Sequence, residues 1–152
     1  MIADCLDTKQ MRRAAPLSTG VLPGLLGYRL RRAQQAVFRD FASSVAALSP
    51  GRAGMLLLVE ANPGVTQGRL AQAVGLDRST MVGVIDALEE RGLIERRRGA
   101  DRRTNGLWLT RAGRSFVTRL RRRIELHERR VAAHLTPAER EQLLALLEKL
   151  AE

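Results

Sequence analysis

The order of two short helical segments and a basic hairpin constrains the fold of this chain more than any other feature. Residues 67–74 and 78–91 each carry apolar side chains at the spacing of one helix face. The residues expected to begin and end these helices are capping side chains and glycines, namely Thr66, Gly75, Asp77 and Gly92. A short helix, a glycine turn and a second helix predict a helix-turn-helix.

Two strand-like segments follow the second helix. Residues 93–97 are typical of a strand, and residues 106–110 alternate like a returning strand. A charged turn lies between them, so we expect a basic hairpin and hence a winged helix-turn-helix. Such a fold suits DNA, because the second helix can enter a major groove and an arginine-rich tip can reach the neighbouring minor groove. Winged helices also serve as protein-docking modules, and the order of elements leaves that alternative open.

Longer helices are expected on both sides of this lobe. Apolar positions at steps of three and four run from residue 22 to 48, where Pro23 and Gly24 are expected to kink the helix or delay its start. This helix is longer than one small core needs, so part of its apolar stripe is expected to meet another subunit. Ser49 and Pro50 are typical of the start of the next helix.

The C-terminal part of the chain predicts two further helices. Residues 111–135 form one pattern, and the capping box Thr136-Pro137-Ala138-Glu139 begins the last. The fold class is therefore mainly α with a small β-hairpin wing. The expected parts are a mobile tail at 1–16, dimerisation helices at 17–48 and 111–152, and a DNA-binding lobe at 49–110.

Charge indicates the kind of partner. The 152 residues include 26 Lys and Arg against 16 Asp and Glu, a net charge of +10, which favours a polyanion such as nucleic acid. Only Lys9 and Lys149 are lysines, an arginine bias that often follows genome base composition. One local cluster lies in the wing and a second in the helix after it, where a solvated helix face is as good an explanation as DNA contact. The clusters are Arg91, Arg96, Arg97, Arg98, Arg102 and Arg103, and then Arg119, Arg121, Arg122, Arg123, Arg129 and Arg130.

Several function classes are not expected from this composition. No apolar run approaches the roughly 18 residues of a membrane span, and the first residues lack the apolar segment of a signal peptide, so a cytoplasmic location is expected. Cys5 is the only cysteine, which excludes an internal disulfide, and no metal site is expected from one cysteine and two histidines. We find no activated nucleophile, paired carboxylates or nucleotide-binding glycine motif, so neither an enzyme nor a cofactor is expected.

From about residue 20 to 150 the sequence resembles the MarR-type transcriptional regulators. The motifs that carry the resemblance are Leu76-Asp77-Arg78-Ser79-Thr80-Met81, Leu88-Glu89-Glu90-Arg91-Gly92-Leu93-Ile94, and Asp101-Arg102-Arg103 followed by Leu109-Thr110. The spacing of Asp101 and Arg103, with Leu-Thr after the wing, is the most specific of them. The resemblance implies a homodimer whose first and last helices intertwine, and which binds double-stranded DNA.

The resemblance also implies which residues contact DNA. Arg103 would enter the minor groove, oriented by Asp101, in the same basic wing as Arg98 and Arg102. Base and phosphate contacts would come from Arg78, Ser79 and Thr80, and phosphate contacts from Thr66, Gln67 and Arg69. Val82 and Gly83 depart from the family pattern, in which polar or basic residues are frequent; Val82 could instead touch a thymine methyl group.

The same resemblance implies a mechanism. Each subunit would place one recognition helix on half of a pseudo-palindromic operator, with centres roughly 34 Å apart. A ligand bound between the dimerisation helices and the DNA-binding lobe would change that spacing and release a repressor from its operator.

The opening of the first long helix suggests an effector class. Residues 22–28 look like the branch of the family that responds to aromatic acids or their coenzyme A thioesters, such as a hydroxycinnamoyl-CoA. Arginine suits phosphate geometry, so a row of arginines here could pair with the phosphates of coenzyme A, although a solvated helix face or salt bridges to the DNA-binding lobe explain the row better. An aromatic pocket and a histidine complete the candidates. The candidate ligand residues are Tyr28, Arg29, Arg31, Arg32, Phe38 and His127.

Two alternatives to an effector-bound regulator remain. Some relatives sense peroxides through a cysteine near the first helix, which would require Cys5 to have a lowered pKa and a fixed position. Cys5 lies between Asp4 and Asp7, whose charges disfavour the thiolate. The second alternative is a winged-helix module that docks protein, for which an arginine oriented by an acid at the wing tip would be unnecessary.

Overall fold

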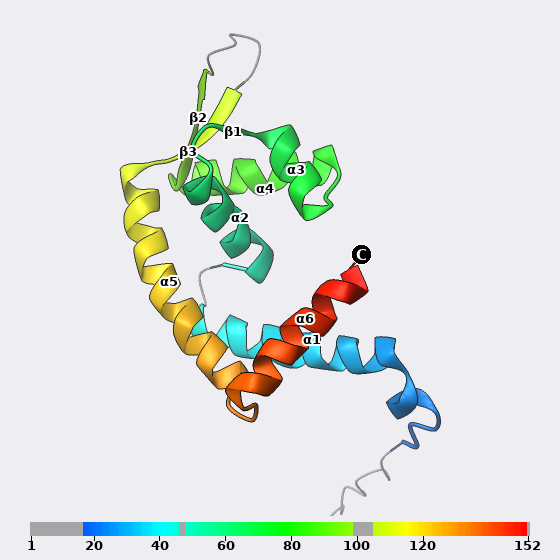
Figure 1. The fold of residues 1–152 in the computed structure, drawn as a ribbon. Helices are drawn as coiled ribbons and strands as arrows, with labels where there is room; N and C mark the ends of the chain where they lie inside the picture. The colour runs from blue at the N-terminus through cyan, green and yellow to red at the C-terminus, as the bar shows by residue number, and fades with distance from the viewer. Residues whose placement is uncertain (1–16, 46–47, 99–104, 152) are drawn as a thin grey trace, which may run out of the picture. The chain divides into compact units, whose positions relative to one another are not determined.

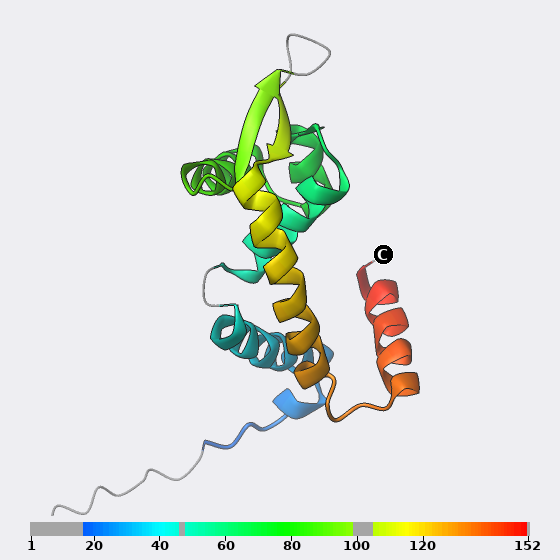
Figure 2. The ribbon, with the colours of Figure 1, turned by 90° about the vertical axis from the view of Figure 1, so that its left-hand side faces the viewer.

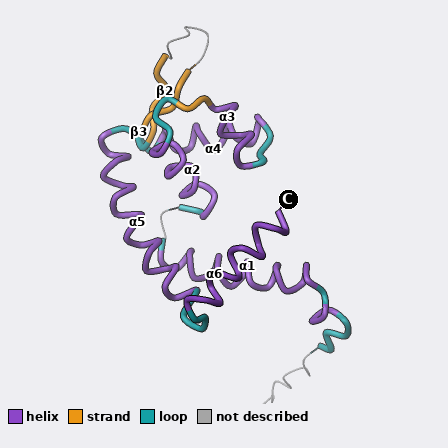
Figure 3. The backbone as a smooth tube through the Cα atoms, in the orientation of Figure 1, coloured by secondary structure: helices purple, strands orange, loops and turns teal. Residues whose placement is uncertain are grey.

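The computed structural model describes residues 17–45, 48–98 and 105–151. Six α-helices, one short 3-10 helix and three strands lie in these ranges, and Figures 1 and 3 show their order along the chain. They are η1 (Leu22–Gly24), α1 (Leu26–Ser44), α2 (Pro50–Ala61), β1 (Val65–Thr66), α3 (Gln67–Val74), α4 (Arg78–Glu90), β2 (Ile94–Arg98), β3 (Asn105–Leu109), α5 (Arg111–Val131) and α6 (Pro137–Ala151).

The chain divides between Ala33 and Gln34, inside α1. In the first part, Pro23 lies in η1. Leu25 has an extended backbone and separates η1 from α1, which begins at Leu26. The prediction that Pro23 and Gly24 delay the start of the long helix is confirmed. Several large apolar side chains of this part are exposed, among them Leu17, Val21, Leu22, Leu25 and Leu26.

The helix-turn-helix forms where the sequence predicts it. Thr66 caps α3 and Asp77 caps α4, each by accepting a hydrogen bond from a backbone N–H three residues later. Gly75 ends α3 with φ +66°, a left-handed conformation that costs glycine little. The inner face of α4 carries Met81, Ile85 and Leu88, which are completely buried. These side chains hold α4 against the core and leave its opposite face in solvent.

The wing is a three-stranded antiparallel sheet in the order β1-β3-β2. Strands β2 and β3 pair from Ile94 with Leu109 to Arg98 with Asn105, and Figure 2 shows them side by side where β3 leads into α5. Arg98, expected in the turn, is the last residue of β2. Strand β1 is not predicted from the sequence, because two residues are too few to show a strand period. Pairing of β1 with Leu107 and Gly106 fixes the start of α3 to the sheet.

One threonine joins the wing to α5. Thr110 Oγ1 accepts a hydrogen bond from the Gly113 N–H at 2.9 Å and donates one to the Gly92 carbonyl oxygen at 2.6 Å. At Gly113 the helix passes so close to Leu93, the residue before β2, that an added Cβ would lie 1.9 Å from the Leu93 carbonyl oxygen. This contact sets the direction in which α5 leaves the lobe.

The outer helices are shorter than expected. α1 ends at Ser44 rather than at residue 48, because the hydroxyls of Ser43 and Ser44 both donate to the Asp40 carbonyl oxygen and compete with the helix ladder. α5 ends at Val131 rather than at residue 135, and a turn leads from there to the capping box of Thr136 and Glu139 that begins α6. None of the helices in the described part of the chain is long and apolar enough to cross a membrane.

Candidate nucleic-acid interface

The N-terminal ends of α3 and α4 lie together at the surface of the lobe. A hollow of about 360 Å³ lies between them, lined by side chains from both helices. Four of the lining residues are predicted DNA contacts, which the fold therefore brings to one place. The lining is Thr66, Gln67, Gly68, Ala71, Arg78 and Val82.

Asp77 organises the start of α4. Its carboxylate accepts hydrogen bonds from the hydroxyls of Ser79 at 2.5 Å and Thr80 at 2.6 Å, and from the Thr80 N–H at 2.9 Å. These bonds, led by the one from Ser79, hold the pKa of Asp77 well below its usual range. Both hydroxyls are thus occupied as donors, while their lone pairs remain available. In this arrangement Ser79 and Thr80 can accept from a base amino group, whereas donating to a phosphate requires release from Asp77.

Arg78 lines the hollow, and Arg69 lies in the first turn of α3, two residues after the lining residue Gln67. Both side chains are exposed, and neither makes a hydrogen bond or ion pair with any residue that the structure describes. Thr66 Oγ1 is occupied as the cap of α3, accepting from the Arg69 N–H at 3.4 Å. Two cations without internal partners, beside two helix N-termini, form a surface suited to phosphates.

The arginines of the wing have different roles. Arg96 turns back to α4, where it bonds Asp86 at 2.5 Å and also pairs with Glu89, and these bonds raise its pKa. Arg97 lies over the Trp108 ring at 5.5 Å. Arg98 is exposed at the end of β2. Arg96 therefore ties the wing to α4, whereas Arg98 remains available to a partner. The predicted contacts Asp101, Arg102 and Arg103 lie outside the described residues.

In the arginine cluster of α5, three members have internal contacts. Arg121 pairs with Glu60 of α2, Arg119 lies 6.0 Å from the centre of the Phe116 ring, and Arg130 pairs with Asp40 of α1. Of the two explanations open for this cluster, these contacts favour a structural one. DNA contact is not needed to account for them.

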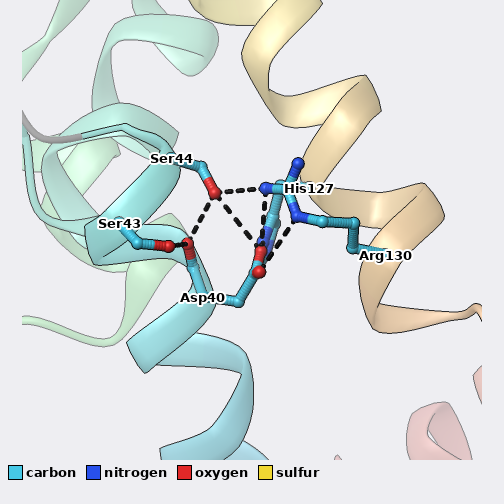
Figure 4. A network of polar contacts seen from close by, with 5 residues as sticks. All are labelled: Asp40, Ser43, Ser44, His127 and Arg130. Carbon is cyan, nitrogen blue, oxygen red and sulfur yellow. Dashed lines mark hydrogen bonds and ion pairs between the residues drawn. The ribbon is translucent and has the colours of Figure 1, made fainter.

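The side chains of α1 and α5 form a polar network that the sequence does not predict (Figure 4), made by Asp40, Ser44, His127 and Arg130. His127 is only 3% exposed, and its Nδ1 lies 2.6 Å from Asp40 Oδ2. Arg130 donates to both Asp40 oxygens at 3.0 Å. These bonds, chiefly that from Arg130, hold the pKa of Asp40 well below its usual range. No sequence signal joins α1 to α5 here, because the paired residues are 87 and 90 positions apart.

Comparison with known proteins agrees with this architecture. A model of the MarR family matches residues 48–104. A protein of Thauera aromatica, named as a transcriptional regulator for the hcr operon, is 39% identical over 140 residues, which are 90% of this chain and 84% of that protein. The chain belongs to the MarR family. As a MarR-family member it is a transcriptional regulator rather than an enzyme.

Solved structures of one MarR-type repressor confirm the fold class. CouR bound to a 23-mer DNA duplex matches with a TM-score of 0.86 and 41% identity, over 91% of this chain and 100% of that one. CouR bound to p-coumaroyl-CoA matches with a TM-score of 0.84 and 39% identity, over 90% of this chain and 99% of that one. The predicted winged helix-turn-helix between long helices is therefore the fold of this MarR-family chain.

The predicted ligand residues of this MarR-family chain have varied surroundings. Arg29 Nε donates to the Pro23 carbonyl oxygen at 2.7 Å, and Arg32 lies 5.9 Å from the centre of the Tyr28 ring and donates to its hydroxyl. Arg31 is exposed. Phe38 is half exposed in an open hollow along α1. His127 differs from these, since its ring is enclosed by Asp40 and by an edge-on contact with Phe41 at 5.2 Å between ring centres.

Proposed function

We propose that this chain is a ligand-responsive repressor that binds a pseudo-palindromic operator as a homodimer and leaves it when an aromatic acyl-CoA thioester binds. The observation that carries the proposal is the similarity to CouR, which is about 40% identical over about nine-tenths of this chain and is solved both on DNA and with p-coumaroyl-CoA. A cytoplasmic location follows from a target of this kind.

The DNA side of the proposal uses the surface around the hollow. Arg69 and Arg78 face solvent without internal partners in the described residues, as phosphate contacts must. Ser79 and Thr80 stand at the start of α4, the end of a recognition helix that reaches base edges. Arg98 leads from β2 toward the wing tip, where Arg103 and Asp101 are the proposed minor-groove pair.

The dimer side of the proposal uses the outer helices. The leucines of α6 are between 38% and 53% exposed, and monomeric proteins rarely leave such a row of apolar side chains in water. Residues 17–48 and 111–152 are the proposed dimerisation region, and residues 49–110 the DNA-binding lobe. The exposed leucines are Leu143, Leu144, Leu146, Leu147 and Leu150.

The effector side of the proposal names a class of molecule. A coenzyme A thioester carries phosphates that arginines bind well and an acyl group that needs an apolar pocket. Arg29, Arg31 and Arg32 are the proposed phosphate partners. Tyr28 and Phe38 are the proposed partners of the aromatic acyl group, and a free aromatic acid would use these two alone.

The test is binding to a labelled operator duplex, measured by fluorescence anisotropy with and without a hydroxycinnamoyl-CoA. The duplex is selected from a random pool by the purified protein, and a scrambled duplex is the control. We expect selective, salt-sensitive binding that the thioester abolishes and that Arg103→Ala removes. Equal, weak binding to both duplexes would reject the regulator and favour a docking module. Selective binding that the thioester leaves unchanged would reject the effector class alone.

A further inference from the structure

The outer face of α4 carries an apolar side chain where the proposed function places DNA. The first two turns expose Arg78, Ser79, Val82 and Gly83, while Met81 points into the core. Val82 is 43% exposed and lines the hollow beside Arg78. Its side chain is not part of the core against which α4 packs. Packing of the fold therefore does not require an apolar residue at this position.

The far end of the same helix limits how DNA can lie on it. Asp86 and Glu89 face β2, where Arg96 pairs with both, and Glu90 is exposed in the last turn. Carboxylates repel phosphates, and two of these three are already occupied by Arg96. The duplex must therefore approach the first two turns, with Val82 near the middle of the contact.

Gly83, next to Val82, permits a close approach to the same face. Glycine inside a helix makes the helix less stable than alanine would, and here an added Cβ would meet nothing within 4 Å. No protein neighbour therefore requires this glycine. The missing side chain leaves room for another molecule to come close to this side of α4, beside the exposed Val82.

We propose that Val82 reads the C5 methyl group of one thymine in each operator half-site, and that Gly83 lets the base edge approach closely enough for that contact. In the major groove this methyl group is the apolar feature that distinguishes thymine. The inference rests on the proposed DNA binding and deepens it, because it assigns base discrimination at this position to van der Waals contact.

Uracil substitution tests the contact directly, because uracil lacks the methyl group and keeps every hydrogen-bonding atom of thymine. Each thymine of the selected operator is replaced singly by uracil, and affinities are measured by anisotropy. We expect one thymine per half-site at which uracil weakens binding about fourfold, and about fifteenfold when both half-sites are changed, as burial of one methyl group predicts. No uracil-sensitive thymine at any position would overturn the proposal.

The variant Val82→Ala identifies the side chain that makes the contact. It should bind the thymine operator more weakly and should no longer distinguish thymine from uracil at the sensitive position. Arg78→Ala is the matched control from the same face, since losing a phosphate contact should lower affinity for both duplexes and keep their ratio. A thymine-to-uracil ratio that persists in Val82→Ala would overturn the proposal.

The variant Gly83→Ala tests the close approach. We expect a thermal midpoint a few degrees higher, because the helix gains stability, together with at least tenfold weaker operator binding. Operator binding equal to that of the unchanged chain would overturn this part. These outcomes are distinguishable from failure of the proposed function, in which the unchanged chain would select no duplex from the pool and both proposals would fall.

Discussion

On the inner side of the winged lobe, an arginine and a glycine are each in close contact with other residues of the protein. Arg96 bonds Asp86 and Glu89, and Gly113 lies against the Leu93 carbonyl oxygen. On the outer side, Arg78 makes no ion pair within the described residues, and a Cβ on Gly83 would meet nothing. The same two residue types thus serve the fold on one side and remain available to a partner on the other. Their neighbours, rather than their identities, decide which property a substitution changes.

The largest effect is expected from Gly113→Ala. The new methyl group would overlap the Leu93 carbonyl oxygen, so α5 or β2 must move. We expect the free energy of unfolding to fall by about 3 kcal/mol, measured by urea denaturation at fixed protein concentration. Gly83→Ala is the matched control and should raise it by about 0.5–1 kcal/mol. Equal stability of the two variants would remove the distinction between the sides.

The two arginines should separate stability from binding. Arg96→Ala leaves Asp86 and Glu89 without their shared partner, and we expect a loss of about 1–2 kcal/mol in the free energy of unfolding. Arg78→Ala should leave stability unchanged, weaken operator binding, and lower the slope of log affinity against log salt by about 1 per subunit. Denaturation and anisotropy on both variants check this. A stability loss in Arg78→Ala would contradict its assignment to the outer side.

A smaller effect is expected at the inner junction between the wing and α5. Thr110→Ala removes both the cap on Gly113 and the bond to the Gly92 carbonyl oxygen. We expect a loss of about 1 kcal/mol, whereas Thr110→Ser keeps the hydroxyl and most of the stability. Thermal or urea unfolding of the two variants measures the difference, and an equal loss in both would mean that the methyl group matters more than the cap.

The smallest effect is expected on the pH dependence of stability in acid. The folded pKa of Asp40 lies below its ordinary value of 3.8, so its ionised form stabilises the fold above that pH, and this contribution is lost as the pH falls below it. Asp40→Asn should make stability less steeply dependent on pH between about pH 5 and 2. Urea midpoints of both proteins across this range provide the measurement. Parallel profiles would show that the network with Arg130 does not contribute to acid sensitivity.

The sequence predicts the lobe well because its signals are local. Thr66, Gly75 and Asp77 act within a few residues of their own positions, so the caps and turns follow from the chain itself. The ends of α1 and α5 were placed too late, since the apolar spacing continues beyond the last helical residue of each. Contacts between residues far apart in the sequence, such as Asp40 and His127, cannot be predicted from local signals.

The candidate site shows the same limit. The exposed positions of Arg69, Arg78 and Val82 follow from helical spacing around buried residues. The role of Arg96 does not, because nothing in the local pattern distinguishes it from its neighbours Arg97 and Arg98. Only the pairing of β2 with α4 places Asp86 and Glu89 beside it.

The junction of Asp40 with His127 also has a consequence for the order of folding. The two residues are 87 positions apart, and the winged lobe lies between them in the chain. Closing so long a segment costs entropy, which a lobe that is already folded reduces by shortening the effective loop. We therefore expect the junction to form after the lobe and to open before it. The end of α1 would then detach and return while the lobe keeps its structure, a motion that hydrogen exchange along α1 would detect.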